Sequence, residues 1–119
     1  MATFYWVGGS GNWSDFAVHW ATTSGGSTHP ANAPTSADDV VFDANSDTGS
    51  GFTVTINTTG NHASFDNTAV DQVMTMSGSN QTLNAYGNVT IKSTTVIGTF
   101  GTWRFQGATS KTITSNGAV

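Results

Sequence analysis

The sequence contains no cysteine and no glutamate, and leucine occurs once, as Leu83. Without cysteine, neither a disulfide framework nor a cysteine-ligated zinc site can form. The residues from which helices are usually built are scarce, whereas Thr, Ser, Asn and Gly supply about half of the chain. Thr and the apolar residues that remain favour strands, and Gly, Asn, Asp and Ser favour turns. The composition therefore predicts an all-β chain.

Basic residues are also few, because Lys92, Arg104 and Lys111 stand against seven aspartates for a net charge of −4. Binding to nucleic-acid phosphates needs a concentrated basic stripe, so we expect no nucleic-acid partner. No apolar run approaches the roughly 20 residues that span a bilayer, and the N-terminus lacks a basic segment followed by an apolar one. We therefore expect no membrane span and no export signal.

The length of 119 residues suits one domain with a modest core. Low aliphatic content predicts that this core is thin and that a partner surface completes it. We expect a single all-β domain over residues 1–119, with a Trp/Gly-rich capping or docking block at residues 1–43 and short strands over residues 44–119.

The most distinctive segment is YWVGGSGNW at residues 5–13, which is followed by His19 and Trp20. Three of the four tryptophans thus fall within fifteen residues, separated by glycine and small polar residues. Glycine accepts positive φ and lets large rings pack directly against the main chain. The pattern predicts a compact hairpin or corner that holds aromatic rings together.

Short apolar or alternating runs, most of them followed by Gly or Asn, indicate strands along the rest of the chain. The clearest lies at residues 52–57, where apolar residues alternate with polar ones, so its apolar side is expected to face a core. The expected strands cover residues 4–7, 39–43, 52–57, 63–66, 72–76, 82–85, 89–92, 96–100, 102–106 and 111–114.

Turn signals at this regular spacing fit two architectures, a β-solenoid or a jelly-roll or sandwich. The segments at residues 84–91, 101–107 and 111–117 resemble one another at a loose spacing of a little over ten residues. Two or three such strands would make a rung of roughly twenty-odd residues, the size of one solenoid coil. The repeat is too degenerate to decide between the two architectures.

The block WVGGSGNW at residues 6–13, the segment PTSADDVVFD at residues 34–43 and the later TITSNG at residues 112–117 together resemble a family of bacteriophage virion proteins and β-helical adhesins. In that family a W-x-G-G-x-G-x-W block opens a chain of short, glycine-punctuated strands. The resemblance implies an extracellular or virion-surface architecture and carries over no catalytic residue.

Clustered aromatic rings can stack on sugars, but they more often pack in a core or an interface. We therefore expect the cluster of Trp6, Trp13 and Trp20 to be structural, with at least two of its rings buried. The candidate interaction residues are Tyr5, Trp6, Trp13, Trp20 and Trp103.

Two other groups of side chains could bind a metal. Calcium favours carboxylate oxygens, which Asp38, Asp39 and Asp43 could supply, but strand alternation places Asp38 on the face opposite to the other two. We expect these carboxylates to cap turns. The histidines His19, His29 and His62 are too scattered for a zinc site within one copy, and we expect them to be hydrogen-bonded structural residues, although a trimer axis could gather three copies of one of them.

Catalytic signatures are weak as well. The Gly-x-Ser-x-Gly nucleophile pattern is absent, and the lack of Glu leaves no recognisable carboxylate pair for glycoside hydrolysis. We expect no catalytic residue, no metal and no cofactor, so the chain is predicted not to be an enzyme.

These observations predict a non-enzymatic structural protein on a virion surface. Small size favours a capsid decoration or cement protein that binds the major capsid protein or another virion protein. The alternative is a tail-fibre or adhesin fragment that binds a host-surface carbohydrate. Strand edges left unpaired in a monomer favour a homo-oligomer, with a trimer ahead of a dimer.

Overall fold

The computed structural model describes residues 2–107 and 112–115, which contain strands and no helix. The strands are β1 (Thr3–Trp6), β2 (Gly11–Asn12), β3 (Trp20–Ala21), β4 (Asp39–Asp43), β5 (Phe52–Ile56), β6 (Gly60–His62), β7 (Phe65–Ala69), β8 (Met74–Gly78), β9 (Gln81–Ala85), β10 (Val89–Thr90), β11 (Val96–Ile97), β12 (Gly101–Phe105) and β13 (Ile113–Thr114).

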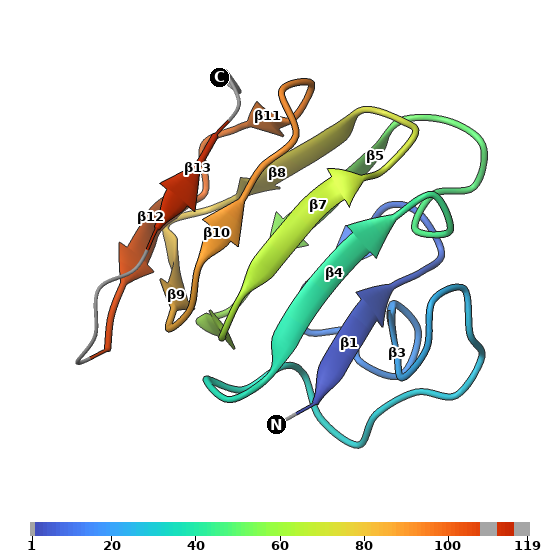
Figure 1. Cartoon of the computed structure of the whole chain (residues 1–119), viewed down its shortest axis with the longest axis horizontal. Helices are drawn as coiled ribbons and strands as arrows, with labels where there is room; N and C mark the ends of the chain where they lie inside the picture. The colour runs from blue at the N-terminus through green and yellow to red at the C-terminus, as the bar shows by residue number, and fades with distance from the viewer. Residues whose placement is uncertain (1, 108–111, 116–119) are drawn as a thin grey trace.

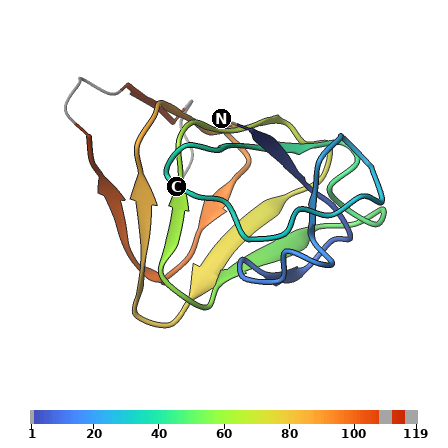
Figure 2. The ribbon, with the colours of Figure 1, turned by 90° about the horizontal axis from the view of Figure 1, so that it is seen from below.

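The strands form a β-solenoid of about three turns, so the solenoid and not the sandwich is the correct one of the two expected architectures. Sheet A has the order β13-β10-β7-β4-β1-β3 and faces the viewer in Figure 1. Sheet B has the order β11-β8-β5-β2, and sheet C the order β12-β9-β6. Seen from below in Figure 2, the three sheets lie around a common interior.

Each complete coil contributes one strand to each sheet, in the order A, B, C along the chain. Parallel pairing aligns Val40 with Phe65, Phe65 with Val89, and Val89 with Ile113, so equivalent positions in sheet A are 25, 24 and 24 residues apart. This repeat agrees with the rung of roughly twenty-odd residues expected from the sequence. Side chains at equivalent positions therefore stack directly on one another.

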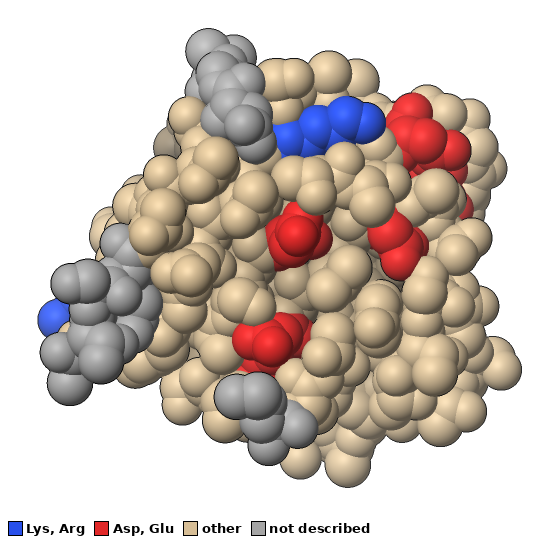
Figure 3. Space-filling model, in the orientation of Figure 1, with Lys and Arg blue, Asp and Glu red and all other residues tan. Residues whose placement is uncertain are grey.

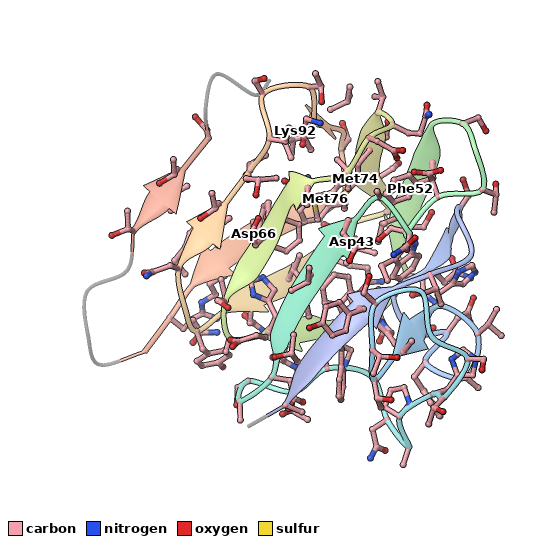
Figure 4. The ribbon with its side chains drawn as sticks, turned by 45° about the vertical axis from the view of Figure 1, so that its right-hand side comes forward. Asp43, Phe52, Asp66, Met74, Met76 and Lys92 are labelled. Atoms are coloured by element: carbon pink, nitrogen blue, oxygen red, sulfur yellow. The ribbon has the colours of Figure 1, made fainter. Side chains whose placement is uncertain are left out.

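The core is built from the inward-facing side of every strand. In β4 the side chains of Val40 and Phe42 are buried, while Asp39, Val41 and Asp43 lie on the outer face, as the alternation predicts. The expected alternation also holds in β5, where every second side chain is buried. Figure 4 shows that Phe52, Met74 and Met76 of sheet B point toward sheet A, and all three are buried.

A buried amide in β7 joins the third coil to the fourth. The side chain of Asn67 has no exposed surface. Its Nδ2 donates to Thr95 Oγ1 (2.8 Å), and its Oδ1 accepts from the backbone N–H of Lys92 (2.8 Å). Because these partners are themselves part of the next coil, the hydrogen bonds satisfy a polar group in the core and fix how the coils stack.

The first coil differs from the others and closes the N-terminal end of the solenoid. After β1 in sheet A and β2 in sheet B, the chain returns as β3, which runs antiparallel beside β1. The reversal uses Gly8 and Gly9 with φ of 84° and 74°, and Gly11 at a close approach where a Cβ would lie 2.1 Å from His19 Nε2. The expected compact corner is therefore present.

Most expected strands are confirmed with small shifts in their ends. The strands expected at residues 39–43 and 52–57 are β4 and β5, whereas the strand expected at 63–66 is β7, which begins at Phe65 and runs to Ala69. The strand expected at 111–114 is β13, and Lys111 lies outside the described residues. Strands β2, β3 and β6 were not expected, because two or three residues cannot show an alternation.

Candidate functional site: the two ends of the solenoid

The N-terminal end is an aromatic cap in which Trp6, Trp13 and Trp20 are all completely buried. Trp20 meets the rings of Trp6 and Trp13 edge to face, at centroid distances of 5.1 and 5.0 Å. The Nε1–H of Trp20 donates to the carbonyl oxygen of Trp13 (2.9 Å), and that of Trp6 to the carbonyl oxygen of Gly9 (2.7 Å). The expectation that at least two of the three rings are buried is confirmed, and none of them offers an open face to a sugar.

The two other candidate interaction residues lie apart from this cap. Tyr5 is half-buried on the outer face of sheet A, aligned with Val41. Trp103 is half-buried on the inward-facing side of β12, and its ring packs against Phe65 at a centroid distance of 4.9 Å. The structure therefore brings three of the five candidates together and leaves Tyr5 and Trp103 with partly exposed rings.

His62 connects the aromatic cap to Trp103 at the centre of the solenoid. Burial lowers the pKa of its imidazole from 6.5 to about 4, although a backbone hydrogen bond to Ala63 and the charge of Asp39 act in the opposite direction. Its Nδ1–H donates to the carbonyl oxygen of Ala63 (2.8 Å), and its Nε2 accepts from Trp103 Nε1–H (3.1 Å). This arrangement requires the neutral ring. The sequence predicted a structural histidine but did not indicate that it lies in the core.

The other two histidines secure the cap from outside. His19 stacks on Trp6 at a centroid distance of 4.8 Å and donates from Nδ1 to the carbonyl oxygen of Val7 (2.7 Å). His29 donates from Nδ1 to the carbonyl oxygen of Trp20 (2.6 Å). The second contact covers part of the free edge of β3. The expectation of hydrogen-bonded structural histidines is thus confirmed.

The three aspartates considered as calcium ligands instead hold turns and strand ends. Asp38 accepts hydrogen bonds from the backbone N–H groups of Ala2 and Thr35, and Asp39 from that of Ser64. Asp43 accepts from the backbone N–H of Asn45 (2.9 Å). Figure 3 shows the acidic side chains distributed over the face of sheet A, with a basic side chain at its upper margin and another at its left margin. Among the described residues, no group of three or more His, Asp or Glu could hold a metal ion.

Asp47 and Asp71 form a pair of carboxyl groups between sheets A and B. The side-chain hydrogen bond to Asp47 is the main cause of a raised pKa at Asp71, and Oδ2 of Asp47 is buried with no donor among the described residues. The charge of Asp47 also raises the pKa of Asp71, since two ionised carboxylates at this distance would repel each other.

Replacing Asp71 by Asn is expected to raise the melting temperature at pH 7, because an amide can donate to Asp47 without carrying charge. At pH 3, below the raised pKa of Asp71, that carboxyl group already carries a proton that it can donate to Asp47, so the gain should disappear. Melting curves of parent and variant at both pH values measure this difference. A variant less stable than the parent at pH 7 would contradict the prediction.

Among the described residues, the last coil of the solenoid exposes apolar side chains, whereas the first coil is closed by its buried tryptophans. Strands β11, β12 and β13 are the last strands of their sheets among the described residues, and no described strand pairs with their outer edges. Phe105 and Ile113 are 40% and 53% exposed, whereas the residues stacked beneath them, Ala85 and Val89, are 0% and 1% exposed. We call the inward-facing residues of this coil, Ile97, Trp103, Phe105 and Ile113, the open end.

The sequence predicts only Trp103 among the residues of the open end. The signal was nevertheless present, because the segments around Trp103 and Ile113 alternate like the buried strands before them. Only the coil register reveals that these positions face inward.

No protein-family model, curated protein or solved structure matches this chain. No helix among the described residues is long and apolar enough to cross a membrane. No pocket is found in the described part of the chain.

Proposed function

We propose that this chain is a non-enzymatic structural protein of a bacteriophage virion, a decoration protein that attaches to the shell by its open end. The contrast between the two ends carries the proposal. One end is closed by buried tryptophans, and the other exposes side chains whose counterparts one coil earlier are buried. Exposed apolar side chains beside the outer edges of strands, where no described strand pairs, are typical of a surface that binds another protein.

The resemblance to virion surface proteins and β-helical adhesins suggests that the protein lies on the surface of a virion. A protein that sits on a larger shell needs one adhesive end and one end that does not associate further. Attachment to the shell implies a virion protein as the partner. This partner is the major capsid protein or another virion protein at a boundary between subunits. Binding to the assembled shell but not to free subunits would stabilise the shell by about 2.7 kcal/mol per site at a free concentration of one hundred times the Kd.

Particles that lack the protein are therefore expected to release their genome at a lower temperature than complete particles. Adding back the purified parent chain should restore heat resistance, because binding to the shell shifts its equilibrium toward the intact form. A Phe105→Asp chain should not restore it, whereas a Val18→Asp chain, altered at an exposed valine of the capped end, should do so. Genome release is measured by dye uptake during heating. Equal heat resistance with and without the protein would contradict the decoration role.

A second candidate function is the terminal part of a tail fibre or adhesin that binds a host-surface carbohydrate. The solenoid favours it, since coils of this kind build elongated structures by addition at an open end. The buried cap leaves Tyr5 and Trp103 as the candidate residues with exposed ring surface. Copy number separates the two functions, because a decoration protein is present in hundreds of copies per particle and a fibre protein in a few to tens.

A further inference from the structure

We infer that the hydrogen bond between His62 and Trp103 is an acid-sensitive latch. A proton taken up by His62 breaks this bond and releases Trp103 and strand β12 from the interior, while the coils before them stay folded. The latch needs no partner, so it is independent of the role proposed for the open end.

The bond connects two strands that are not neighbours. In sheet C, β9 lies between β6 and β12, so the outer two are roughly 10 Å apart. His62 is aligned with Ala85, and Trp103 with Leu83. The small side chain of Ala85 leaves room for the two rings to meet, at a centroid distance of 6.0 Å. An indole has one donor and no acceptor, so the bond to His62 is the whole polar attachment of the Trp103 ring.

The proton would enter at the atom that makes the latch. Nδ1 of His62 already carries a hydrogen, which it donates to the carbonyl oxygen of Ala63 (2.8 Å), so Nε2 is the free position. Once Nε2 carries a proton, it is a donor that faces the Nε1–H donor of Trp103. The rings of Trp13 and Phe65, at centroid distances of 6.1 and 5.5 Å from His62, offer no acceptor either.

Trp103 is the partner that is free to move. His62 has no exposed surface, whereas Trp103 is half-buried and its neighbours in β12, Thr102 and Arg104, are exposed. Among the described strands, β12 pairs with β9 alone. Local opening of a strand with so little buried surface costs less free energy than unfolding of the core. When Trp103 leaves, water reaches Nε2 of His62.

The charges around His62 are too weak to keep a proton on the closed form. Asp39, on the outer face of sheet A, favours the protonated ring, while the carboxylate of Asp38 accepts backbone N–H groups and Arg104 lies on the outer face of sheet C. Burial outweighs the charge of Asp39 and lowers the pKa of His62 from 6.5 to about 4. Because release hydrates the ring and restores its ordinary pKa, acidification from pH 7 to pH 4 should raise the ratio of released to closed form about 100-fold.

Hydrogen exchange of the Trp103 Nε1–H, followed by NMR, tests the latch. Its protection factor, which corrects for the pH dependence of intrinsic exchange, is expected to fall about 100-fold between pH 7 and pH 4. Low urea concentrations should leave it unchanged, because local opening exposes little surface. The Nε1–H of Trp20, bonded to the carbonyl oxygen of Trp13, is the internal control. It should exchange more slowly at each pH and respond more steeply to urea.

Variants separate the proton from the bond. His62→Gln places a neutral amide that can accept from Trp103 Nε1–H and donate to the Ala63 carbonyl oxygen, so protection should no longer fall between pH 7 and pH 4. His29→Gln, at an exposed histidine of the capped end, should behave like the parent.

A variant on the other side of the latch gives a second measurement. Trp103→Phe keeps an aromatic ring but lacks the donor. Its reporter is the backbone N–H of Gln106, which is bonded to the carbonyl oxygen of Ala85 (2.7 Å). This N–H should be less protected than in the parent at pH 7 and should differ less from the parent at pH 4.

A protection factor at Trp103 that is the same at pH 7 and pH 4 in the parent would overturn the inference. An equal fall in His62→Gln would also overturn it, because that variant has no proton to gain at position 62. Exchange at Trp103 with the same rate and urea dependence as at Trp20 would show that the opening is global, and the latch would again be excluded.

Discussion

Replacing Trp13 by Ala is expected to lower the free energy of unfolding by about 3–5 kcal/mol, the range for large aromatic truncations in cores. Trp13 is completely buried, meets Trp20 edge to face and fills the space where the first coil has no strand in sheet C. Its removal would open a cavity under the whole cap. Urea denaturation at neutral pH measures the loss.

Two phenylalanine variants make matched controls for this prediction. The Nε1–H of Trp13 has no acceptor among the described residues, so Trp13→Phe loses volume but no hydrogen bond. Trp20→Phe loses a similar volume and also the bond to the Trp13 carbonyl oxygen, so it should cost about 1 kcal/mol more. A Trp13→Ala chain as stable as the parent but unable to bind a sugar would contradict the structural role.

Acidification from pH 6.5 to pH 4 is expected to destabilise the protein by about 3 kcal/mol through His62 alone. Burial lowers the pKa of this ring to about 4 in the folded state, whereas the unfolded chain takes up the proton near 6.5. The unfolded state therefore binds more protons throughout this interval. The contribution is complete above pH 6.5, decreases as the pH falls and levels off below about 4.

Unfolding by urea at half-unit steps of pH measures this slope. His62→Leu removes this titrating group and should lack the loss of about 3 kcal/mol that the parent shows between pH 6.5 and 4, with a lower stability at pH 7 because Trp103 Nε1–H loses its acceptor. An unchanged stability of the parent over the same interval would show that His62 is not buried as a neutral ring.

Local sequence patterns were sufficient to predict the all-β class and the buried sides of the longer strands. The alternation around Val40 and Phe42 identified the inner face of β4 correctly, and the glycines between Trp6 and Trp13 indicated the corner. These features depend on neighbours in the sequence. Periodicity and turn chemistry therefore determine them.

The sequence did not decide between solenoid and sandwich, because that choice depends on which strands pair. The alignment of Phe65 with Val89 is a contact across 24 residues, and nothing local specifies it. The same reason explains why β3 and β6 were missed, since these short strands exist only through their neighbours. The open end could not be predicted either, because Phe105 looks like a core residue until the register shows that no described strand follows it in its sheet.

Equivalent positions in neighbouring strands of sheet A are separated by a nearly constant number of residues. This constancy determines how such a chain could change its length. Because each coil contacts the coils before and after it, a duplicated segment of 24 residues beginning at Phe65 would present the same inner side chains and the same strand edges on both sides. Insertion between the second and third coils would leave both the tryptophan cap and the exposed last rung intact. The number of coils can therefore change while the residues at both ends of the solenoid stay the same. Related sequences could differ in length and keep the same tryptophan cap and the same last coil.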